Sequence, residues 1–336
     1  MKRGTAFAIL LLAALPLAGQ SPTAVRVGYF PNITHAQALI GKATGKFDQA
    51  LAPGAKVEWK AFNAGPSAIE ALFAGALDLA YVGPNPAISG YIRSQGAALR
   101  VIAGATSGGA ALVVREGSGI QKPEDFHGKR VATPQLGNTQ DVALRAWLHA
   151  HNLQTREKGG DVQVIPIANA DQLTLFLKGE IDAAWAPEPW ASRLIQEAKG
   201  RLFFDERDLW PNRRFVTAQL IVSTAFLQQH PDLVKKWLRE HVELTAWINA
   251  NPAEAKQILN QQIQKDTGRA LPAAVLDSAY SRLEVTYDPI RSSLLTSARW
   301  AFDAEYLGRE LPDLSGLYAL SPLNDVLREM KAKPVQ

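Results

Sequence analysis

The sequence predicts an α/β protein of two lobes, each a mainly parallel sheet flanked by helices, with two crossings between the lobes and a helical C-terminal region. Strand-like and helix-like segments alternate through the first two thirds of the 336 residues, which is typical of parallel sheets covered on both faces. One segment occurs twice, and the last third is mainly helical in pattern. Hydrophobic residues make up 47% of the chain, enough for a substantial core.

The repeated segment supports two lobes over one. Residues 72–80 (L-F-A-G-A-L-D-L-A) match residues 176–184 (F-L-K-G-E-I-D-A-A) in chemical type, and a Pro-x-Pro turn follows each copy. Each copy has the pattern of a helix end with a Gly cap, then an Asp and a short apolar strand. Because open α/β sheets bind ligands at the carboxyl ends of strands, we expect the two turns to face a common site.

The first lobe is expected to consist of strands that end in polar turns. The expected strands are 25–30, 56–62, 77–82, 99–103 and 110–114, and the expected helices are 36–42, 68–74 and 87–94. Ser67 and Glu70 have the spacing of a capping box for the second of these helices. The chain becomes polar and Gly-rich from Arg115 onward, which places the first expected crossing there.

The second lobe contains the clearest candidate anion site, the turn and helix after the strand end at residues 130–132. Asn138 and Thr139 stand where the N-cap belongs, and Asp141 falls in the first turn. Unpaired N–H groups and a partial positive charge at such a turn can hold a small anion; an ordinary capped helix is the alternative. Further strands at 162–166, 181–185 and 201–204 and a helix at 171–177 complete the lobe.

The strand expected at 216–223 returns the chain to the first lobe. Helices are then expected at 225–229, 231–250, 252–265, 272–285 and 292–307, and each opens near Ser, Thr, Asn or Pro. We therefore expect residues 24–114 and 216–336 to form lobe 1, and residues 115–215 to form lobe 2.

Residues 1–20 have the pattern of a secretory signal peptide, with Lys2 and Arg3, an apolar run and small residues near a cleavage site. An uncleaved N-terminal anchor is the alternative. Loss of the signal would lower the net charge of +4 by two, so the charge gives no indication of nucleic-acid binding. The absence of cysteine from the sequence excludes a disulfide frame, a thiolate metal site and a lipid-modified N-terminal Cys.

The motifs of common enzymes do not occur in the sequence. It contains no G-x-S-x-G elbow, no G-x-x-x-x-G-K-[ST] phosphate loop and no H-E-x-x-H zinc motif. The turns after the expected strands instead hold hydroxyl, amide and Gly residues, which suit reversible capture of a small anion. We therefore expect a binding protein that is not an enzyme and that has no cofactor and no metal.

Three residues in these turns allow two interpretations each. His35 either contacts the ligand or only stabilises its own turn. Glu188 either meets a cationic group in the pocket or forms a salt bridge between the lobes. Trp190 either walls an apolar ligand tail or packs in the core.

Several of these stretches together resemble a known family. V-R-V-G-Y-F-P-N-I-T-H-A, Y-V-G-P-N-P-A, S-G-G-A-A-L-V-V-R, T-P-Q-L-G-N-T-Q-D-V-A-L-R and D-A-A-W-A-P-E-P-W are similar to segments of the solute-binding components of ABC importers for nitrate, sulfonate and taurine. The resemblance extends from about Val25 to Leu323. It implies a two-lobed periplasmic binding protein, type II-like, that closes over its ligand.

The resemblance also implies a set of ligand contacts. These are Asn32, Thr34, His35, Ser67, Asn85, Gly109, Asn138, Thr139, Gln140, Glu188 and Trp190. The implied solute is a small oxyanion, an alkanesulfonate or taurine, with nitrate, an aromatic sulfonate or a pyrimidine-type solute as alternatives. A hydrolase or biosynthetic enzyme on the same fold is a further alternative. The implied partners are an ABC permease and its ATPase, and we expect a periplasmic monomer.

Overall fold

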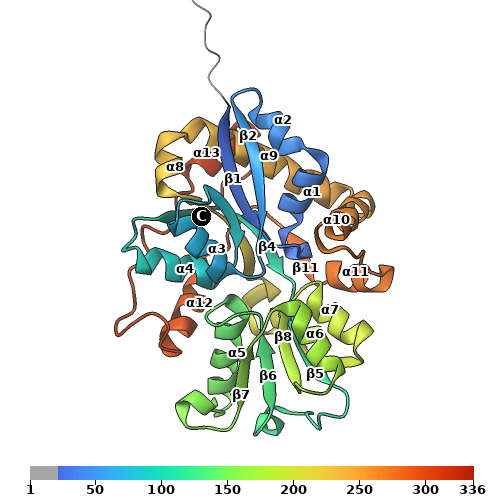
Figure 1. Ribbon diagram of the computed structural model, residues 1–336. Coiled ribbons are helices and arrows are strands. Elements are labelled where there is room, and N and C mark those ends of the chain that lie inside the picture. The colour runs from blue at the N-terminus through green and yellow to red at the C-terminus, as the bar shows by residue number, and fades with distance from the viewer. Residues whose placement is uncertain (1–21) are drawn as a thin grey trace, which may run out of the picture.

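Two sheets, one in each lobe, form the framework of the molecule (Figure 1). The computed structural model describes residues 22–336, so the signal peptide expected at residues 1–20 lies outside the described part. The first sheet has six strands in the order β11-β4-β10-β3-β1-β2, and the second has five in the order β7-β6-β8-β5-β9. The predicted two-lobed α/β fold is confirmed.

Lobe 1 is built on the first sheet. Its strands are β1 (Thr23–Tyr29), β2 (Ala55–Ala61), β3 (Leu79–Val82), β4 (Leu99–Gly108), β10 (Val216–Ser223) and β11 (Leu283–Val285). Strands β2 and β3 run parallel to β1, and β10 runs antiparallel between β3 and β4. The parallel strands point the same way, so the polar turns that follow them meet at one edge of the sheet.

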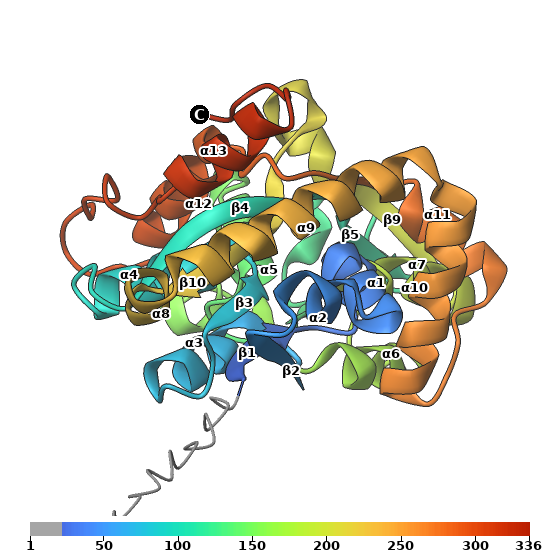
Figure 2. The same ribbon diagram turned by 90° about the horizontal axis from the view of Figure 1, so that it is seen from above.

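Helices cover both faces of this sheet. One face carries α1 (Ala36–Thr44), α2 (Lys46–Leu51), α9 (Pro231–Ala250), α10 (Pro252–Thr267) and α13 (Ser321–Glu329). The other face carries α3 (Gly65–Phe73), α4 (Pro84–Arg93) and α12 (Arg291–Asp303). The connecting helices are α8 (Thr224–Gln229) and α11 (Ala273–Tyr280). Seen from above, the long helix α9 lies over the sheet (Figure 2).

Lobe 2 repeats the arrangement with fewer elements. Its strands are β5 (Ala110–Arg115), β6 (Arg130–Thr133), β7 (Gln163–Pro166), β8 (Ala183–Pro187) and β9 (Gly200–Asp205). Helix α5 (Thr139–Ala150) covers one face with the aromatic side chains of Phe126 and Trp147. Helices α6 (Asn169–Leu177) and α7 (Trp190–Glu197) cover the other.

The chain leaves lobe 1 earlier than the sequence predicted. Strand β5 pairs with β8 and β9 of the second sheet, so the first crossing lies at Gly108 and Gly109 and not at Arg115. Both glycines have positive φ, 72° and 78°, a conformation that lets the backbone turn between the sheets without strain. The change to polar composition at Arg115 marks the end of β5. The chain returns to the first sheet between β9 and β10.

The repeated sequence segments form the same structure in both lobes. In lobe 1, Asp78 accepts hydrogen bonds from the backbone and guanidinium of Arg26, which also donates to the Gly75 carbonyl. In lobe 2, Asp182 accepts the same bonds from Arg130, which donates to the Gly179 carbonyl. We call each arrangement an Arg–Asp clasp; it fixes the start of one parallel strand to its neighbour at the end remote from the cleft.

Local helix signals were only partly correct. Helix α3 begins at Gly65, and its N-cap is Ala64. The capping box expected at Ser67 is therefore wrong, because Gly65-Pro66 already provides a favourable first turn. The sequence did not predict α2, β11 or α13.

Among residues 22–336, no helix has the length and apolar character that a membrane span requires.

Candidate functional site

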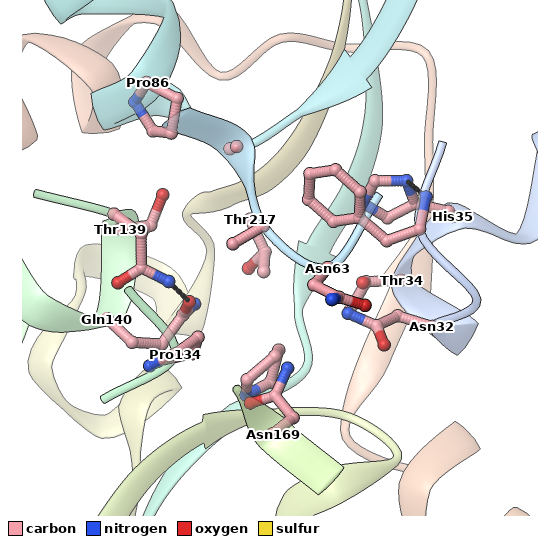
Figure 3. A pocket seen from close by; sticks show the side chains of 16 residues that line it. Asn32, Thr34, His35, Asn63, Pro86, Pro134, Thr139, Gln140, Asn169 and Thr217 are labelled. Carbon is pink, nitrogen blue, oxygen red and sulfur yellow. Dashed lines mark hydrogen bonds between the residues drawn. The ribbon is translucent and has the colours of Figure 1, made fainter. Parts of the chain in front are cut away.

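A pocket lies between the lobes where the turns after several strands meet (Figure 3). Its cavity volume is about 30 Å³. Its lining comes from both lobes and from the crossing strand β10. The lining residues are Phe30, Asn32, Thr34, His35, Asn63, Ala64, Gly65, Gly83, Pro86, Pro134, Asn138, Thr139, Gln140, Asn169, Pro187 and Thr217. None of these described lining residues is an aspartate, glutamate, lysine or arginine.

Five helices direct their N-termini at the pocket. The N-cap or first residue of each helix is part of the lining: His35 for α1, Ala64 for α3, Gly83 for α4, Asn138 for α5 and Asn169 for α6. First-turn N–H groups have no acceptor within their own helix and carry a partial positive charge. The pocket therefore has a positive potential without a formally charged side chain.

The first turn of α5 is organised by its own side chains. Asn138 is the N-cap, and its Oδ1 accepts from the backbone N–H of Asp141 at 2.9 Å. Its Nδ2 donates to Oε1 of Gln140 at 3.1 Å. This bond fixes the amide of Gln140 so that Nε2, the donor end, remains for a ligand. The N-cap predicted from the sequence is confirmed.

Three buried side chains in the lining hold polar atoms that have no hydrogen-bond partner among the described residues. They are Oγ1 of Thr139, Oγ1 of Thr217 and Oδ1 of Asn169. The three residues are only 6%, 6% and 7% exposed. Leaving a buried polar group without a partner costs about 1–3 kcal/mol, so these atoms mark a place where a ligand would complete the hydrogen bonding.

His35 is a neutral donor at this site. Its Nδ1 accepts from the backbone N–H of Phe30 at 3.2 Å, so in the neutral ring the proton is on Nε2. Burial lowers the pKa of His35 to about 3, and the ring is therefore uncharged at neutral pH. The side chain is 2% exposed and lines the pocket.

Contacts between the lobes hold the pocket closed. Nε1 of Trp190 in lobe 2 donates to Oδ1 of Asn32 in lobe 1 at 2.9 Å. Gly83 lies so close to Thr139 that a Cβ at this position would overlap Oγ1 of the threonine. Tyr306 donates to Oδ2 of Asp141 at 2.7 Å. The conformation is thus one in which the two halves of the site already touch.

A second polar region joins the lobes beside the crossings. We call it the hinge cluster; it consists of Glu188, Asp205, Arg207 and Arg282. Oε1 of Glu188 lies 3.2 Å from Nε of Arg282, and Asp205 pairs with Arg207 at 2.7 Å and with Arg282 at 3.5 Å. Glu188 is fully buried, and burial raises its pKa to about 7. It also accepts from the backbone and hydroxyl of Ser192.

The pocket brings together some of the predicted contacts. Asn32, Thr34, His35, Asn138, Thr139 and Gln140 all line it. Ser67 donates to the carbonyl of Ala64 and faces the outer surface of the cleft. The side chain of Asn85 is buried and donates to the carbonyl of Ser297 on α12.

Gly109, Glu188 and Trp190 also lie outside the lining. Gly109 belongs to the crossing, where its N–H donates to the carbonyl of Arg282. Glu188 forms the salt bridge between the lobes that was one of its two interpretations. Trp190 contacts the pocket indirectly, through Asn32.

Sequence reasoning missed several lining residues. Asn63 and Asn169 follow strands β2 and β7, so the rule that found Asn32 and Asn138 could have found them. Pro134 and Pro187 were not among the expected contacts. Thr217 gave no local signal, because it lies at the beginning of a strand and reaches the pocket only through the return crossing.

Comparison with known proteins places the chain among related sequences. The sequence model of the NMT1-like family matches residues 18–263. The taurine-binding periplasmic protein of Escherichia coli is 26% identical over 242 residues, which cover 72% of this chain and 72% of that protein.

Two solved structures share the fold. The alkanesulfonate-binding protein SsuA from Xanthomonas axonopodis pv. citri, bound to MOPS, has a TM-score of 0.71 at 21% identity and covers 86% of this chain and 96% of that one. The periplasmic nitrate-binding protein NrtA from Synechocystis has a TM-score of 0.74 at 16% identity and covers 92% of this chain and 88% of that one.

Proposed function

The chain belongs to the NMT1-like family, and on this basis we propose that it is the solute-binding component of an ABC importer, which captures a small oxyanion between its two lobes. The expected solute is a sulfonate. The observation that supports this proposal is the pocket itself: five helix N-termini converge on a buried space whose hydroxyl groups at Thr139 and Thr217 have no partner among the described residues. An oxyanion accepts hydrogen bonds from such groups.

Uncharged donors are sufficient for useful affinity. A hydrogen bond to a charged group contributes about 1.5–3 kcal/mol. Thr139, Thr217, Gln140 and His35 together with first-turn N–H groups offer at least four such donors. After the costs of ordering and association, four or five bonds of this strength support affinity in the micromolar range.

The apolar part of the lining favours a sulfonate with a short organic group. Phe30, Pro86, Pro134 and Pro187 lie beside the donors. These side chains cannot hydrogen-bond to a ligand, but they can cover a few methylene groups, each of which contributes about 0.8 kcal/mol when buried.

We assign the protein to the periplasm, with an ABC permease and its ATPase as partners. The assignment follows the names of its relatives, among them a taurine-binding periplasmic protein and a periplasmic nitrate-binding protein. In this role the protein carries its solute to the permease unchanged.

The geometry supports binding without catalysis. A hydroxyl nucleophile needs a base within hydrogen-bond reach. Nδ1 of His35 is occupied by the N–H of Phe30, and no hydrogen bond to Thr139 Oγ1 or Thr217 Oγ1 occurs among the described residues. We therefore expect mass spectrometry to recover the solute intact after incubation; a converted product would contradict this assignment.

The test is a thermal-shift panel followed by calorimetry, with nitrate, sulfate, methanesulfonate, 1-propanesulfonate and an aminopyrimidine. A ligand present at 100 times its dissociation constant should add about 2.7 kcal/mol to the free energy of unfolding. We expect the sulfonates to raise the melting temperature. A rise with the pyrimidine alone would overturn oxyanion capture.

A matched pair of variants connects binding to the pocket. Thr139→Val removes one donor while keeping the shape of the side chain, and we expect about tenfold weaker binding. Thr174→Val makes the same change on the exposed face of α6 and should leave affinity unchanged. Equal affinity of both variants would remove the first turn of α5 from the site.

A further inference from the structure

A long irregular segment of lobe 1 connects helices α12 and α13. Residues 304–320, all described by the structure, contain neither a helix nor a strand, and we call them the strap. Connections of this length without secondary structure are uncommon in compact domains and often have a functional role. Leu307 and Leu317 of the strap are buried in the core of lobe 1, and the strap backbone pairs with Val101 of β4. The strap is therefore anchored to lobe 1.

The beginning of the strap also contacts lobe 2. Oη of Tyr306 donates to Oδ2 of Asp141 at 2.7 Å, and the guanidinium of Arg145 lies 5.8 Å from the centre of the Tyr306 ring. Both partners belong to α5, which lies beside α12 (Figure 1). Glu305 forms a salt bridge with Lys158, which follows α5 in the chain. The strap thus connects the two lobes outside the pocket.

The carboxylate of Asp141 organises the turn that precedes α5. It is fully buried, and it accepts from Oγ1 of Thr133 at 3.0 Å and from the backbone N–H of Gly137 at 2.9 Å. These bonds join the end of β6 to the turn that follows it. The pocket-lining residues next to these bonds are Pro134, Asn138, Thr139 and Gln140. Asp141 does not line the pocket itself, so it can act on a solute only through this turn and through its charge.

Tyr306 is the donor to Asp141 that comes from the other lobe. Oδ2 of Asp141 also accepts from the backbone N–H of Gly137 and, at 3.3 Å, from Nε of Arg145, and both of these donors lie in lobe 2. Burial raises the pKa of Tyr306, so its hydroxyl is a donor at neutral pH. A carboxylate beside the pocket repels a bound anion, and a donor on that carboxylate reduces the repulsion. The donor from lobe 1 can reach Asp141 only when the lobes meet.

We propose that the strap couples lobe closure to the anion-binding turn, with Tyr306 as a positioning residue that completes the hydrogen bonding of Asp141 when the lobes close and so retains the solute. The Tyr306 bond then belongs to the closed state, and binding and closure favour each other. The inference rests on the proposed function, because it assumes that an anion binds at the first turn of α5. It adds a residue outside the pocket that sets how long the solute stays bound.

Tyr306→Phe tests the inference, because it removes the hydroxyl and keeps the ring beside Arg145. The probe is 1-propanesulfonate, and stopped-flow tryptophan fluorescence gives its rate constants. We expect dissociation about tenfold faster, since a hydrogen bond to a charged group is lost from the closed state. Association should change less than twofold. The ligand-free variant should unfold at the wild-type urea concentration, because the open state does not make the bond.

The control makes the same change near the other end of the strap. Tyr318 forms a bridge with Val101 of lobe 1, and its hydroxyl is buried without a hydrogen-bond partner among the described residues. Tyr318→Phe should leave both rate constants at their wild-type values. Equally fast dissociation in the two variants would overturn the role of the Tyr306 bond, because Tyr318 makes no contact of this kind.

Hydrogen exchange with mass spectrometry tests whether the strap moves with the lobes. Residues 303–308 do not line the pocket, so a bound solute cannot protect them by direct contact. We expect 1-propanesulfonate to slow exchange of this segment about tenfold in the wild-type protein and much less in Tyr306→Phe. Equal exchange with and without the solute would mean that the strap stays on lobe 2 in both states, and it would overturn the inference.

The outcomes separate the inference from the proposed function. Wild-type rate constants in Tyr306→Phe, together with a less stable ligand-free protein, would show that the tyrosine serves only the fold, and they would overturn the inference alone. Failure of both 1-propanesulfonate and nitrate to bind the wild-type protein would overturn the proposed function with it.

Discussion

The pocket and the hinge cluster are both polar, both buried and both formed by the two lobes together. They differ in the charge of their polar groups and in whether those groups have partners within the protein. In the hinge cluster each charged side chain lies beside an opposite charge, as Arg282 does between Glu188 and Asp205. In the pocket the groups are uncharged, and those of Thr139 and Thr217 lack partners among the described residues.

The difference separates a structural contact from a binding site. A buried charge without a partner would destabilise the fold strongly, so charges between the lobes must be paired. An uncharged hydroxyl without a partner destabilises the fold less than an unpaired charge does, and it can still form a hydrogen bond with a ligand. Burial and polarity alone therefore do not identify a site; here the open hydroxyl groups coincide with a lining from both lobes and with converging helix N-termini.

The largest effect should come from separating the lobes at the pocket while leaving the hinge cluster intact. In Gly83→Ala the new Cβ would overlap Oγ1 of Thr139 in the closed conformation. We expect at least a hundredfold loss of affinity in calorimetry, because the closed state is penalised, and a larger radius of gyration with ligand in X-ray scattering. In Gly54→Ala the new Cβ would make only an ordinary contact, so it is the control. Unimpaired binding by Gly83→Ala would contradict this closed geometry.

The next largest effect is expected from the hinge cluster. Arg282→Met leaves Glu188 without its ionic partner and raises the pKa of Glu188 further above about 7. Because a raised pKa gives stability that is lost as pH rises, we expect the free energy of unfolding to fall by about 1 kcal/mol at pH 6 and about 3 kcal/mol at pH 8.5.

Chemical denaturation at the two pH values measures this change. Arg214→Met is the control, since Arg214 pairs with Glu284 at the exposed surface, where such pairs contribute about 0–1 kcal/mol. A loss in Arg282→Met that did not grow with pH would show that Glu188 is not the group left unpaired.

A substitution in the pocket should change affinity and stability in opposite directions. Thr217→Val removes a buried hydroxyl that has no partner among the described residues. We expect about tenfold weaker sulfonate binding, together with a ligand-free protein that is about 1 kcal/mol more stable. Calorimetry and denaturation check the two signs. A loss of both affinity and stability would instead indicate that the hydroxyl serves the fold.

The smallest effect is expected from pH, and it distinguishes the two regions. His35 has its pKa lowered to about 3, so sulfonate affinity should change less than twofold from pH 5.5 to 8.5. The pKa values of Glu188 and Glu206 are raised to about 7, and their contribution to stability is lost as pH rises through that value. The free energy of unfolding should therefore fall by about 1 kcal/mol from pH 6.5 to 8.

Two deviations would be informative. Affinity that rises tenfold for each unit decrease in pH would mean that His35 takes up a proton when the anion binds. Affinity that rises with pH through 7 would mean that the Glu188 salt bridge forms only when the lobes close.

The sequence was a good guide to the fold and a weaker guide to its boundaries. Apolar strands, Gly caps and the repeated segment predicted the alternation of strands and helices and the two lobes. They did not locate the first crossing, because an apolar strand such as β5 fits either sheet equally well. The choice is made by long-range pairing with β8 and β9, which no local pattern encodes.

For the site, the rule that polar turns follow parallel strands singled out Asn32 and Asn138, and both line the pocket; their contact with a ligand stays a prediction. It could not predict the direction of a side chain within a first turn. Ser67 turns away because α3 begins at Gly65, and Asn85 reaches α12, a helix far along the sequence. Thr217 enters the pocket from the return crossing, for which the rule offers no signal.

The paired Arg–Asp clasps have a consequence for ancestry. Arg26 with Asp78 and Arg130 with Asp182 make the same bonds to the same kinds of atoms in the two lobes. Gene duplication and fusion of a single half-sized unit would leave this signature. Before such a fusion, two identical subunits placed face to face would have presented the same helix N-termini to one ligand from both sides.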